Sequence, residues 1–159
     1  MHSIRRIADV APIFASVASD ASKVVYEIYG SPAEVEGVAA LLRATTVLHP
    51  GQVDGEFFMT RGHFHTNPER GEFMVTLSGE GLLVLMNRSR ECRTEPMRCG
   101  SIHDIDGRDA HRVVNTGDVP LVFLVVWMSD CGHDYEAIRE RGFGVRVYAG
   151  ADAPVVTVS

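Results

Sequence analysis

The stretch Gly62-His63-Phe64-His65-Thr66-Asn67-Pro68-Glu69-Arg70-Gly71-Glu72 is the most informative part of this 159-residue sequence. Side chains alternate between the two faces of a strand, so His63 and His65 are expected to point to the same side of a sheet. Glu72 opens the next expected strand, and His111 lies on a more distant one. Three imidazole nitrogens and one carboxylate oxygen suit a borderline divalent ion such as Fe, Mn, Zn, Ni or Co. The sequence therefore predicts a small β-barrel with a metal at its centre.

This prediction depends on the combination of residues, because a single histidine is more often structural than a ligand. Glu69 is a competing carboxylate, but it falls in the loop 66–71, where it is expected to face solvent. Glu72 is therefore preferred as the fourth ligand. His2 and His103 have no comparable context and are interpreted as structural residues.

The rest of the chain has the pattern of short strands separated by turn residues. Many short strands with few helices between them favour a sandwich or barrel. Residues 1–22 are expected to form an N-terminal arm or short helix, and residues 23–159 a single β-barrel domain. Short helices are expected from residue 31 to 42, after a capping box, and at 135–141. The expected strands are 23–29, 44–48, 56–60, 72–77, 81–86, 93–97, 101–104, 110–115, 121–128 and 145–148.

Composition excludes several classes of partner. The formal net charge is −6, and no dense cluster of Lys and Arg indicates a nucleic-acid surface. A phosphorylated substrate stays compatible with this charge, since a phosphate site needs only a few local donors. The longest apolar stretch, 120–128, is about half a membrane span, so no membrane association is expected. The three cysteines form no disulfide or zinc pattern, which favours a cytoplasmic location.

Two motifs carry a resemblance to a known family. Thr60-Arg-Gly-His-Phe-His65 is followed by Glu72 and, seven residues later, by Gly79; the second motif is Gly132-His-Asp-Tyr135. Together they resemble the cupin superfamily and, within it, the cupin-type glucose-6-phosphate isomerases of archaea and some bacteria. The resemblance extends over about three quarters of the chain. It implies an all-β, single-domain cupin fold, a double-stranded β-helix or jelly-roll barrel with one or two short helices.

The resemblance also implies an activity and a set of site residues. The activity is the interconversion of glucose 6-phosphate and fructose 6-phosphate with a bound divalent metal, Fe(II) being favoured and Mn, Zn or Ni being alternatives. A homodimer is implied as well. The site residues implied are His63, His65, Glu72 and His111 for the metal, Thr46, Thr60 and Gly62 for the substrate phosphate, and Glu72, His133 and Tyr135 for catalysis at the sugar end of the pocket.

The residue types agree with this chemistry. A metal polarises a carbonyl and stabilises the charge that develops when it moves between C1 and C2. Glu72 is a candidate base for carrying the proton, whereas a direct hydride shift needs no base, and the sequence leaves both routes open. The hydroxyls of Thr46 and Thr60 and the amide of Gly62 can bind a phosphate dianion with little positive charge.

Four positions depart from the family's pattern and keep other functions open. Met74 replaces a tyrosine and is expected to face the cavity. His49 and Trp127 also stand where tyrosines are usual. Arg108 could hold a second anionic group. The alternatives are a cupin isomerase of another sugar or sugar phosphate, an iron-dependent cupin dioxygenase, and a non-catalytic sensor of sugar phosphates. The apolar segment 10–14 is expected either to reach across a dimer or to close its own barrel.

Overall fold

The computed structural model describes residues 1–30 and 40–159. None of the helices in these ranges is long and apolar enough to cross a bilayer. The elements, in chain order, are β1 (His2–Arg6), α1 (Ile7–Val10), the 3-10 helix η1 (Ala11–Ile13), β2 (Val24–Gly30), β3 (Leu41–Leu48), β4 (Gln52–Val53), β5 (Glu56–Phe57), β6 (Glu72–Ser78), β7 (Glu80–Met86), β8 (Cys92–Arg98), β9 (Ile102–Ile105), β10 (Ala110–Asn115), β11 (Leu121–Met128), α2 (Glu136–Arg139), β12 (Val145–Tyr148) and β13 (Val155–Val158).

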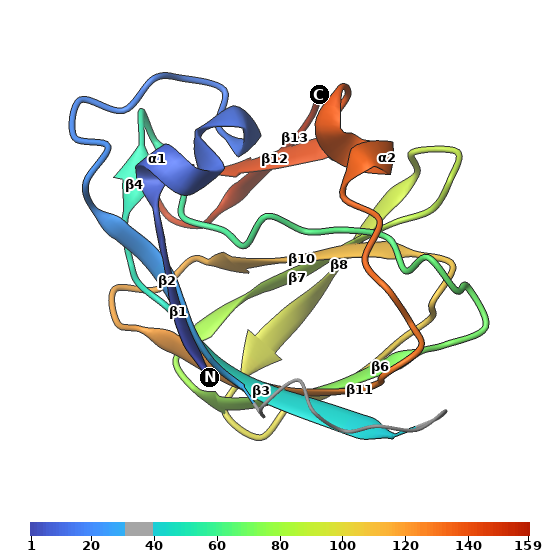
Figure 1. Cartoon of the computed structure of the whole chain (residues 1–159). Helices are drawn as coiled ribbons and strands as arrows, with labels where there is room; N and C mark the ends of the chain where they lie inside the picture. Colours follow the sequence, from blue (N-terminus) through green and yellow to red (C-terminus); the bar gives the residue numbers. More distant parts are fainter. Residues whose placement is uncertain (31–39) are drawn as a thin grey trace.

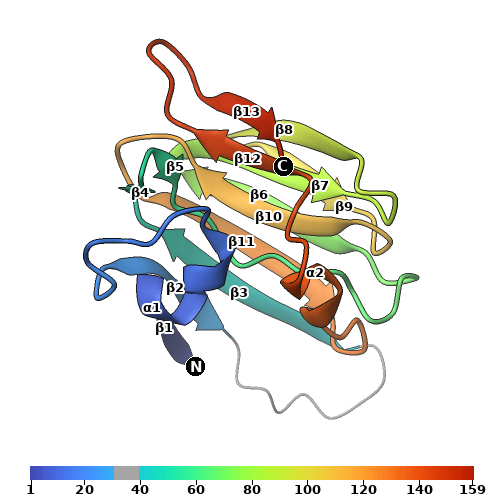
Figure 2. The ribbon, with the colours of Figure 1, turned by 90° about the horizontal axis from the view of Figure 1, so that it is seen from above.

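The strands form three sheets that enclose one interior. The largest sheet has six strands in the order β1-β2-β3-β11-β6-β9, and its neighbouring strands are antiparallel. A three-stranded sheet, β10-β7-β8, faces it, and a four-stranded sheet, β13-β12-β5-β4, lies above (Figure 1). The short helices α1 and α2 lie at the same end of the molecule as β12 (Figure 1), and Figure 2 shows the molecule from that end. This architecture confirms the predicted all-β fold with two short helices.

Alternation of side chains explains which residues of a strand face the interior. On β6 the side chains of Glu72, Met74 and Thr76 are buried, whereas their neighbours Phe73 and Leu77 are exposed. Apolar side chains fill the remaining interior, and each contributes about 1.5–3 kcal/mol when fully buried. The largest of these fully buried apolar residues are Leu48, Met59, Met74, Leu83, Leu85, Met97 and Leu121.

The N-terminal segment packs on its own barrel. Ile7, Val10 and Phe14 are buried in the common core, and the ring of Phe14 lies 6.1 Å from that of Phe58. Of the two interpretations of segment 10–14, closing its own barrel is therefore the one found. The expectation of only an arm or short helix was incomplete, because residues His2–Arg6 form strand β1. Strand β1 is mostly polar and pairs with β2. The sequence of a polar segment does not reveal that it will pair with a strand elsewhere in the chain.

Three boundaries differ from those expected. The expected helix from residue 31 to 42 falls mostly on residues 31–39, outside the described residues, and its last two residues belong to β3 instead. The expected strand 56–60 is shorter, since β5 ends at Phe57 and Met59 forms only an isolated bridge with Val114. Strand β13 was not expected, although its β-branched residues favour a strand.

Candidate metal centre and substrate cavity

Backbone pairing brings the predicted ligands together. His63 and His111 form an isolated antiparallel bridge, in which the His111 amide donates to the His63 carbonyl over 3.1 Å. Strand β10 thereby places His111 opposite the His63-Phe64-His65 segment. Glu72 opens β6, which crosses the same interior. Four residues that are far apart in sequence therefore share one position in the barrel.

The four side chains form a compact cluster suited to one ion. One ligand atom from each of His63, His65, Glu72 and His111 lies within 4.8 Å of all the others. The two oxygens of the Glu72 carboxylate lie 3.6 Å from His65 Nε2 and 3.5 Å from His111 Nε2. His65, Glu72 and His111 are buried. Atoms at these separations surround a space of the size that a divalent cation needs when its ligands lie about 2 Å away.

Unpartnered nitrogens indicate that the cluster fits a metal ion. Nε2 of His63 and of His65, and Nδ1 of His111, are buried and have no hydrogen-bond partner. His111 faces Glu72 with its other ring nitrogen, Nε2. Buried polar atoms are normally satisfied, so the unpartnered Nε2 atoms of His63 and His65 call for an explanation. The other ring nitrogen of His65, Nδ1, lies 2.5 Å from the carbonyl of Arg70. That contact is the outer-shell arrangement that fixes the orientation of a metal-bound imidazole.

The surroundings of the cluster hold His63 and Glu72 in their metal-binding forms, whereas those of His65 favour its protonated form, so that a metal would have to displace a proton from His65. Burial, together with the neighbouring histidines, holds the pKa of His63 far below its usual value, so the ring is neutral. Burial alone would raise the pKa of Glu72, but His111 and His65 lower it overall, which favours the carboxylate. Burial alone would lower the pKa of His65, but Glu72 and the Arg70 carbonyl raise it overall. Neutral imidazole and ionised carboxylate are the forms that bind a metal.

Gly62 cannot be replaced without displacing the metal cluster. Its φ is +74°, a region that side-chain-bearing residues rarely adopt. A Cβ atom there would lie 2.7 Å from the ring of Phe143 and 2.9 Å from the carbonyl oxygen of His111. The glycine therefore permits the close approach of the His63 segment to β10.

A cavity of about 370 Å³ opens beside the cluster. Most of the site residues predicted from the sequence line this cavity, although His65 lies behind its wall. The Thr60 hydroxyl oxygen accepts a hydrogen bond from the Val113 amide over 3.0 Å, which leaves its own hydrogen available for a ligand. The lining includes Thr46, Thr60, Gly62, His63, Glu72, His111, His133 and Tyr135.

His133 and Tyr135 reach the cavity through a second isolated bridge. Phe64 and Asp134 exchange backbone hydrogen bonds, with the Asp134 amide donating over 2.8 Å. The ring centroid of His133 consequently lies 4.4 Å from that of His63, and the Tyr135 centroid lies 5.2 Å from it. Both side chains stand at the metal end of the cavity.

The structure adds residues that sequence reasoning missed. Arg5 from β1, Tyr26 from β2 and Arg61 also line the cavity. The Arg61 guanidinium lies 4.4 Å above the ring centroid of Tyr135. Arg61 stands between two predicted phosphate-binding residues in the sequence, so its position could have indicated a role. No sequence pattern indicated a role for Arg5.

The four departures from the family's pattern fall into two groups. Met74 and Trp127 line the cavity, in agreement with the alternation expected on β6 for Met74. Arg108 is exposed and pairs with Asp106, and it is not among the residues that line the cavity. His49 likewise lies outside that lining, with its Nε2 3.0 Å from Glu27. The structure therefore gives no support to Arg108 as an anion-holding residue of this cavity.

Comparison with known proteins gives a consistent result. Residues 4–158 match the family model described as glucose-6-phosphate isomerase. The chain is 40% identical to the glucose-6-phosphate isomerase of Pyrococcus abyssi over 146 residues, which is 88% of this chain and 77% of the relative. It is 46% identical to that of Pyrococcus horikoshii over 120 residues, 76% of this chain and 63% of the relative. The chain thus spans between about three fifths and three quarters of these relatives' length.

Solved structures with the same fold are more distant in sequence. An oxalate decarboxylase of Lactobacillus farciminis superposes with a TM-score of 0.54 at 21% identity, covering 69% of this chain and 30% of that one. The oxalate decarboxylase of Bacillus subtilis at pH 4.6 gives 0.53 at 20% identity, covering 79% and 29%. These likenesses establish the cupin fold alone. With the family match over nearly its whole length, the chain belongs to the cupin-type glucose-6-phosphate isomerase family.

Proposed function

We propose that this protein is a metal-dependent aldose–ketose isomerase that interconverts glucose 6-phosphate and fructose 6-phosphate. The observation that carries the proposal is one cavity in which a histidine–glutamate cluster stands at one end and hydroxyl and guanidinium donors stand elsewhere on its wall. The volume, about 370 Å³, is in the range of small-molecule sites. Family membership supports the same activity.

His63, His65, Glu72 and His111 would hold the divalent ion. A ligand set of three nitrogens and one oxygen suits Fe(II), Mn, Zn or Ni, and the family resemblance favours Fe(II) among them. The ion, when bound, supplies a Lewis acid that polarises the sugar carbonyl. The carbonyl of Arg70 keeps His65 oriented toward the cluster.

Thr46, Thr60, Gly62 and two arginines would bind the substrate phosphate. The hydroxyl hydrogen of Thr60 is free to donate, because its oxygen already accepts from Val113. Arg5 and Arg61 line the same cavity and add the positive charge that a phosphate dianion attracts. Binding of the phosphate by these residues would hold that end of the sugar away from the metal cluster. The carbons C1 and C2 would then lie beside the metal cluster.

Glu72, His133 and Tyr135 would act on the sugar carbons and their hydroxyls. The Glu72 carboxylate is a candidate to accept the proton from one carbon and return it to its neighbour, whereas a direct hydride shift would leave it only a ligand. His133 and Tyr135, whose ring centroids lie 4.4 and 5.2 Å from that of His63, would donate to or accept from sugar hydroxyls. Isomerisation in D₂O separates the two routes, since only proton transfer through Glu72 introduces solvent deuterium at C1 or C2.

The test is a coupled fructose 6-phosphate to glucose 6-phosphate assay on protein stripped with EDTA and reloaded separately with Fe, Mn, Zn or Ni. Turnover that disappears on stripping and returns with metal supports the proposal and identifies the useful ions. Metal binding without turnover would contradict this substrate assignment.

Met74 and Trp127 favour a second candidate, an isomerase of a different sugar phosphate. Both line the cavity, and neither offers the hydroxyl that the family's tyrosines supply. A substrate hydroxyl left unpaired costs about 1–3 kcal/mol, so a sugar with a different arrangement of hydroxyls could bind better. A panel of aldose and ketose phosphates in the same assay decides between them. An iron-dependent dioxygenase would leave Thr60, Gly62 and His133 without a special role.

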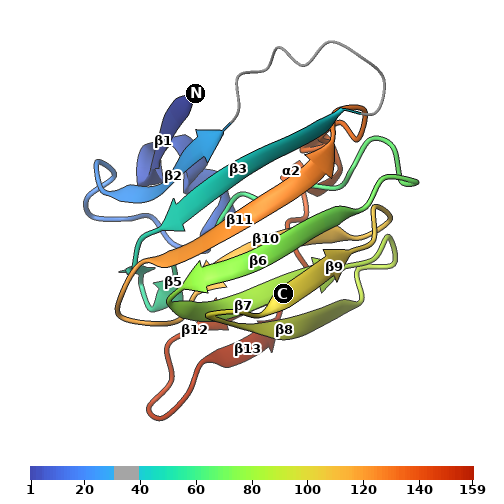
Figure 3. The ribbon, with the colours of Figure 1, turned by 90° about the horizontal axis from the view of Figure 1, so that it is seen from below.

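We further propose a homodimer that forms through the outer face of the six-stranded sheet (Figure 3). Phe73, Leu77 and Ile102 on this face are 39, 46 and 62% exposed. Contiguous exposed apolar side chains are typical of protein–protein contacts. Light scattering is expected to give a dimeric mass for the native chain and a monomeric mass for Ile102→Glu. A monomeric native chain would contradict the dimer.

A cytoplasmic location is also proposed. Cys92, Cys99 and Cys131 are free thiols, as is usual in reducing compartments. Fractionation of the source cells with an antibody against the chain tests this location.

A further inference from the structure

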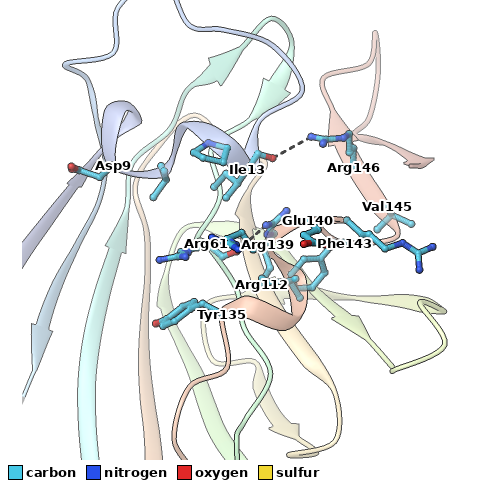
Figure 4. Close-up of a pocket in the computed structure, with 15 residues that line it drawn as sticks. Asp9, Ile13, Arg61, Arg112, Tyr135, Arg139, Glu140, Phe143, Val145 and Arg146 are labelled. Carbon is cyan, nitrogen blue, oxygen red and sulfur yellow. Dashed lines mark hydrogen bonds between the residues drawn. The ribbon is translucent and has the colours of Figure 1, made fainter.

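A second cavity, of about 290 Å³, lies next to the substrate cavity. Arg61 and Tyr135 line both cavities and therefore stand between them. The second cavity is bounded by the end of the N-terminal helices on one side and by α2 and the start of β12 on the other (Figure 4). It contains none of the four residues of the metal cluster.

Strand β10 presents different residues to the two cavities. His111 and Val113 line the substrate cavity, whereas Arg112, between them, lines the second one. Arg112 is only 5% exposed. Its Nη2 donates to the carbonyl of Arg61 over 2.8 Å, and its guanidinium lies 4.3 Å from the ring centroid of Phe143. Figure 4 shows these side chains beside one another.

The charge of Arg112 is not neutralised by a nearby acid. Its Nε is buried without a hydrogen-bond partner, and in the described residues no carboxylate forms an ion pair with it. Glu56 is the acid whose charge acts on it most, but Arg146 and the Ala15 amide already bind that carboxylate, each over 2.8 Å. Buried charges in proteins are normally paired, because an unpaired one is strongly disfavoured.

The rim of the second cavity adds further positive charge. Five arginines and two acids line it. Arg139 and Arg146 are paired with Glu136 and Glu56, and Asp9 accepts from the Arg6 amide. Arg141 is exposed, and its guanidinium has no ion-pair partner within the described parts of the chain. Because Arg61 is assigned above to the substrate phosphate, the available donors are consequently those of Arg112 and Arg141.

We propose that the second cavity is an anion site that binds a small phosphate dianion, with the guanidinium groups of Arg112 and Arg141 as its principal donors. Guanidinium groups are the side chains best suited to phosphate oxygens. A volume of about 290 Å³ accommodates inorganic phosphate or a small phosphoester. The site is separate from the substrate phosphate site proposed above and does not depend on isomerase activity.

Calorimetric titration with inorganic phosphate tests the proposal. The full chain carrying Thr46→Val and Thr60→Val is used, so that the two threonine hydroxyls proposed to bind the substrate phosphate are removed. One phosphate per chain is expected to remain bound. Arg141→Glu, added to this background, is expected to weaken that binding at least tenfold. Arg98→Glu is the matched control, because Arg98 is exposed on β8 and lines neither cavity, and it is expected to change binding less than twofold.

Arg112→Gln is expected to abolish the remaining phosphate binding. If that buried substitution prevents folding, Arg141→Glu alone carries the test.

A titration with methyl phosphate distinguishes the source of the anion. An affinity equal to that of inorganic phosphate indicates that the site accepts phosphoesters, and a tenfold weaker affinity indicates that it is specific for inorganic phosphate. The proposal is overturned if the double-valine protein binds no phosphate at millimolar concentration. It is equally overturned if Arg141→Glu and Arg98→Glu weaken binding to the same extent.

Discussion

Two groups of buried histidines in this barrel differ in how their ring nitrogens are satisfied. His63 and His65 each leave Nε2 without a hydrogen-bond partner beside Glu72. His103 on β9 is buried, as His65 is, yet its Nδ1 lies 2.7 Å from Glu95 and its Nε2 3.0 Å from the Ser101 hydroxyl. The comparison teaches that burial alone does not identify a metal ligand. A buried imidazole with an unpartnered nitrogen, facing other such nitrogens, does point to one.

The largest effect is expected from replacing a ligand. His63→Ala and His111→Ala are each expected to lose the metal and to lower kcat/KM by more than about 100-fold, because even outer-shell partners of a metal cost 10–100-fold. Metal content by mass spectrometry and the isomerase assay measure this. His103→Ala is the control and is expected to retain both metal and activity. Full metal retention in both ligand variants would contradict the assignment.

Glu72→Gln is expected to have the next largest effect. The amide keeps an oxygen for the metal but removes the charge and the ability to accept a proton. If Glu72 carries the proton, kcat at saturating metal is expected to fall by about 10²–10⁴-fold, the usual contribution of a general base. Near-native kcat at saturating metal would instead favour the hydride shift. The metal content of the variant must be measured in parallel.

Thr60→Val is expected to weaken substrate binding more than turnover. A hydrogen bond to a charged group contributes about 1.5–3 kcal/mol, so KM is expected to rise roughly 10–100-fold with a smaller change in kcat. Thr94→Val is the control, since Thr94 is exposed on β8 and lies outside the cavity. Steady-state kinetics with fructose 6-phosphate make the measurement. An unchanged KM would exclude Thr60 as a phosphate donor.

The inward direction of the ligand side chains could be predicted, because it depends on local rules. The alternation of His63 and His65 and the inward position of Glu72 follow from the period of a strand. The bridge between His63 and His111 was not predicted, since no local pattern specifies which distant strands meet.

Other parts of the site could not be predicted because their signals are not local. Arg5 reaches the cavity only because the polar strand β1 pairs with the free edge of β2. Arg112 lies next to a ligand in sequence, and both faces of β10 are buried, so the pattern gave no indication of a second cavity. The interpretation of His103 as structural agrees with its satisfied ring nitrogens.

The smallest expected effect is the loss of stability when His103, the hydrogen-bonded histidine, is replaced. His103→Ala leaves the Ser101 hydroxyl and the Glu95 carboxylate without their shared partner, and it removes a buried ring. A cost of about 1–3 kcal/mol in the free energy of unfolding is expected, which corresponds to a lower Tm by a few degrees per kcal/mol. Denaturant unfolding of metal-free protein measures it, so that metal binding does not contribute. His63→Ala, measured in the same way, is expected to cost less, because its Nε2 has no hydrogen bond to lose in the metal-free state. The reverse order would remove the distinction between structural and metal-binding histidines on which the comparison depends.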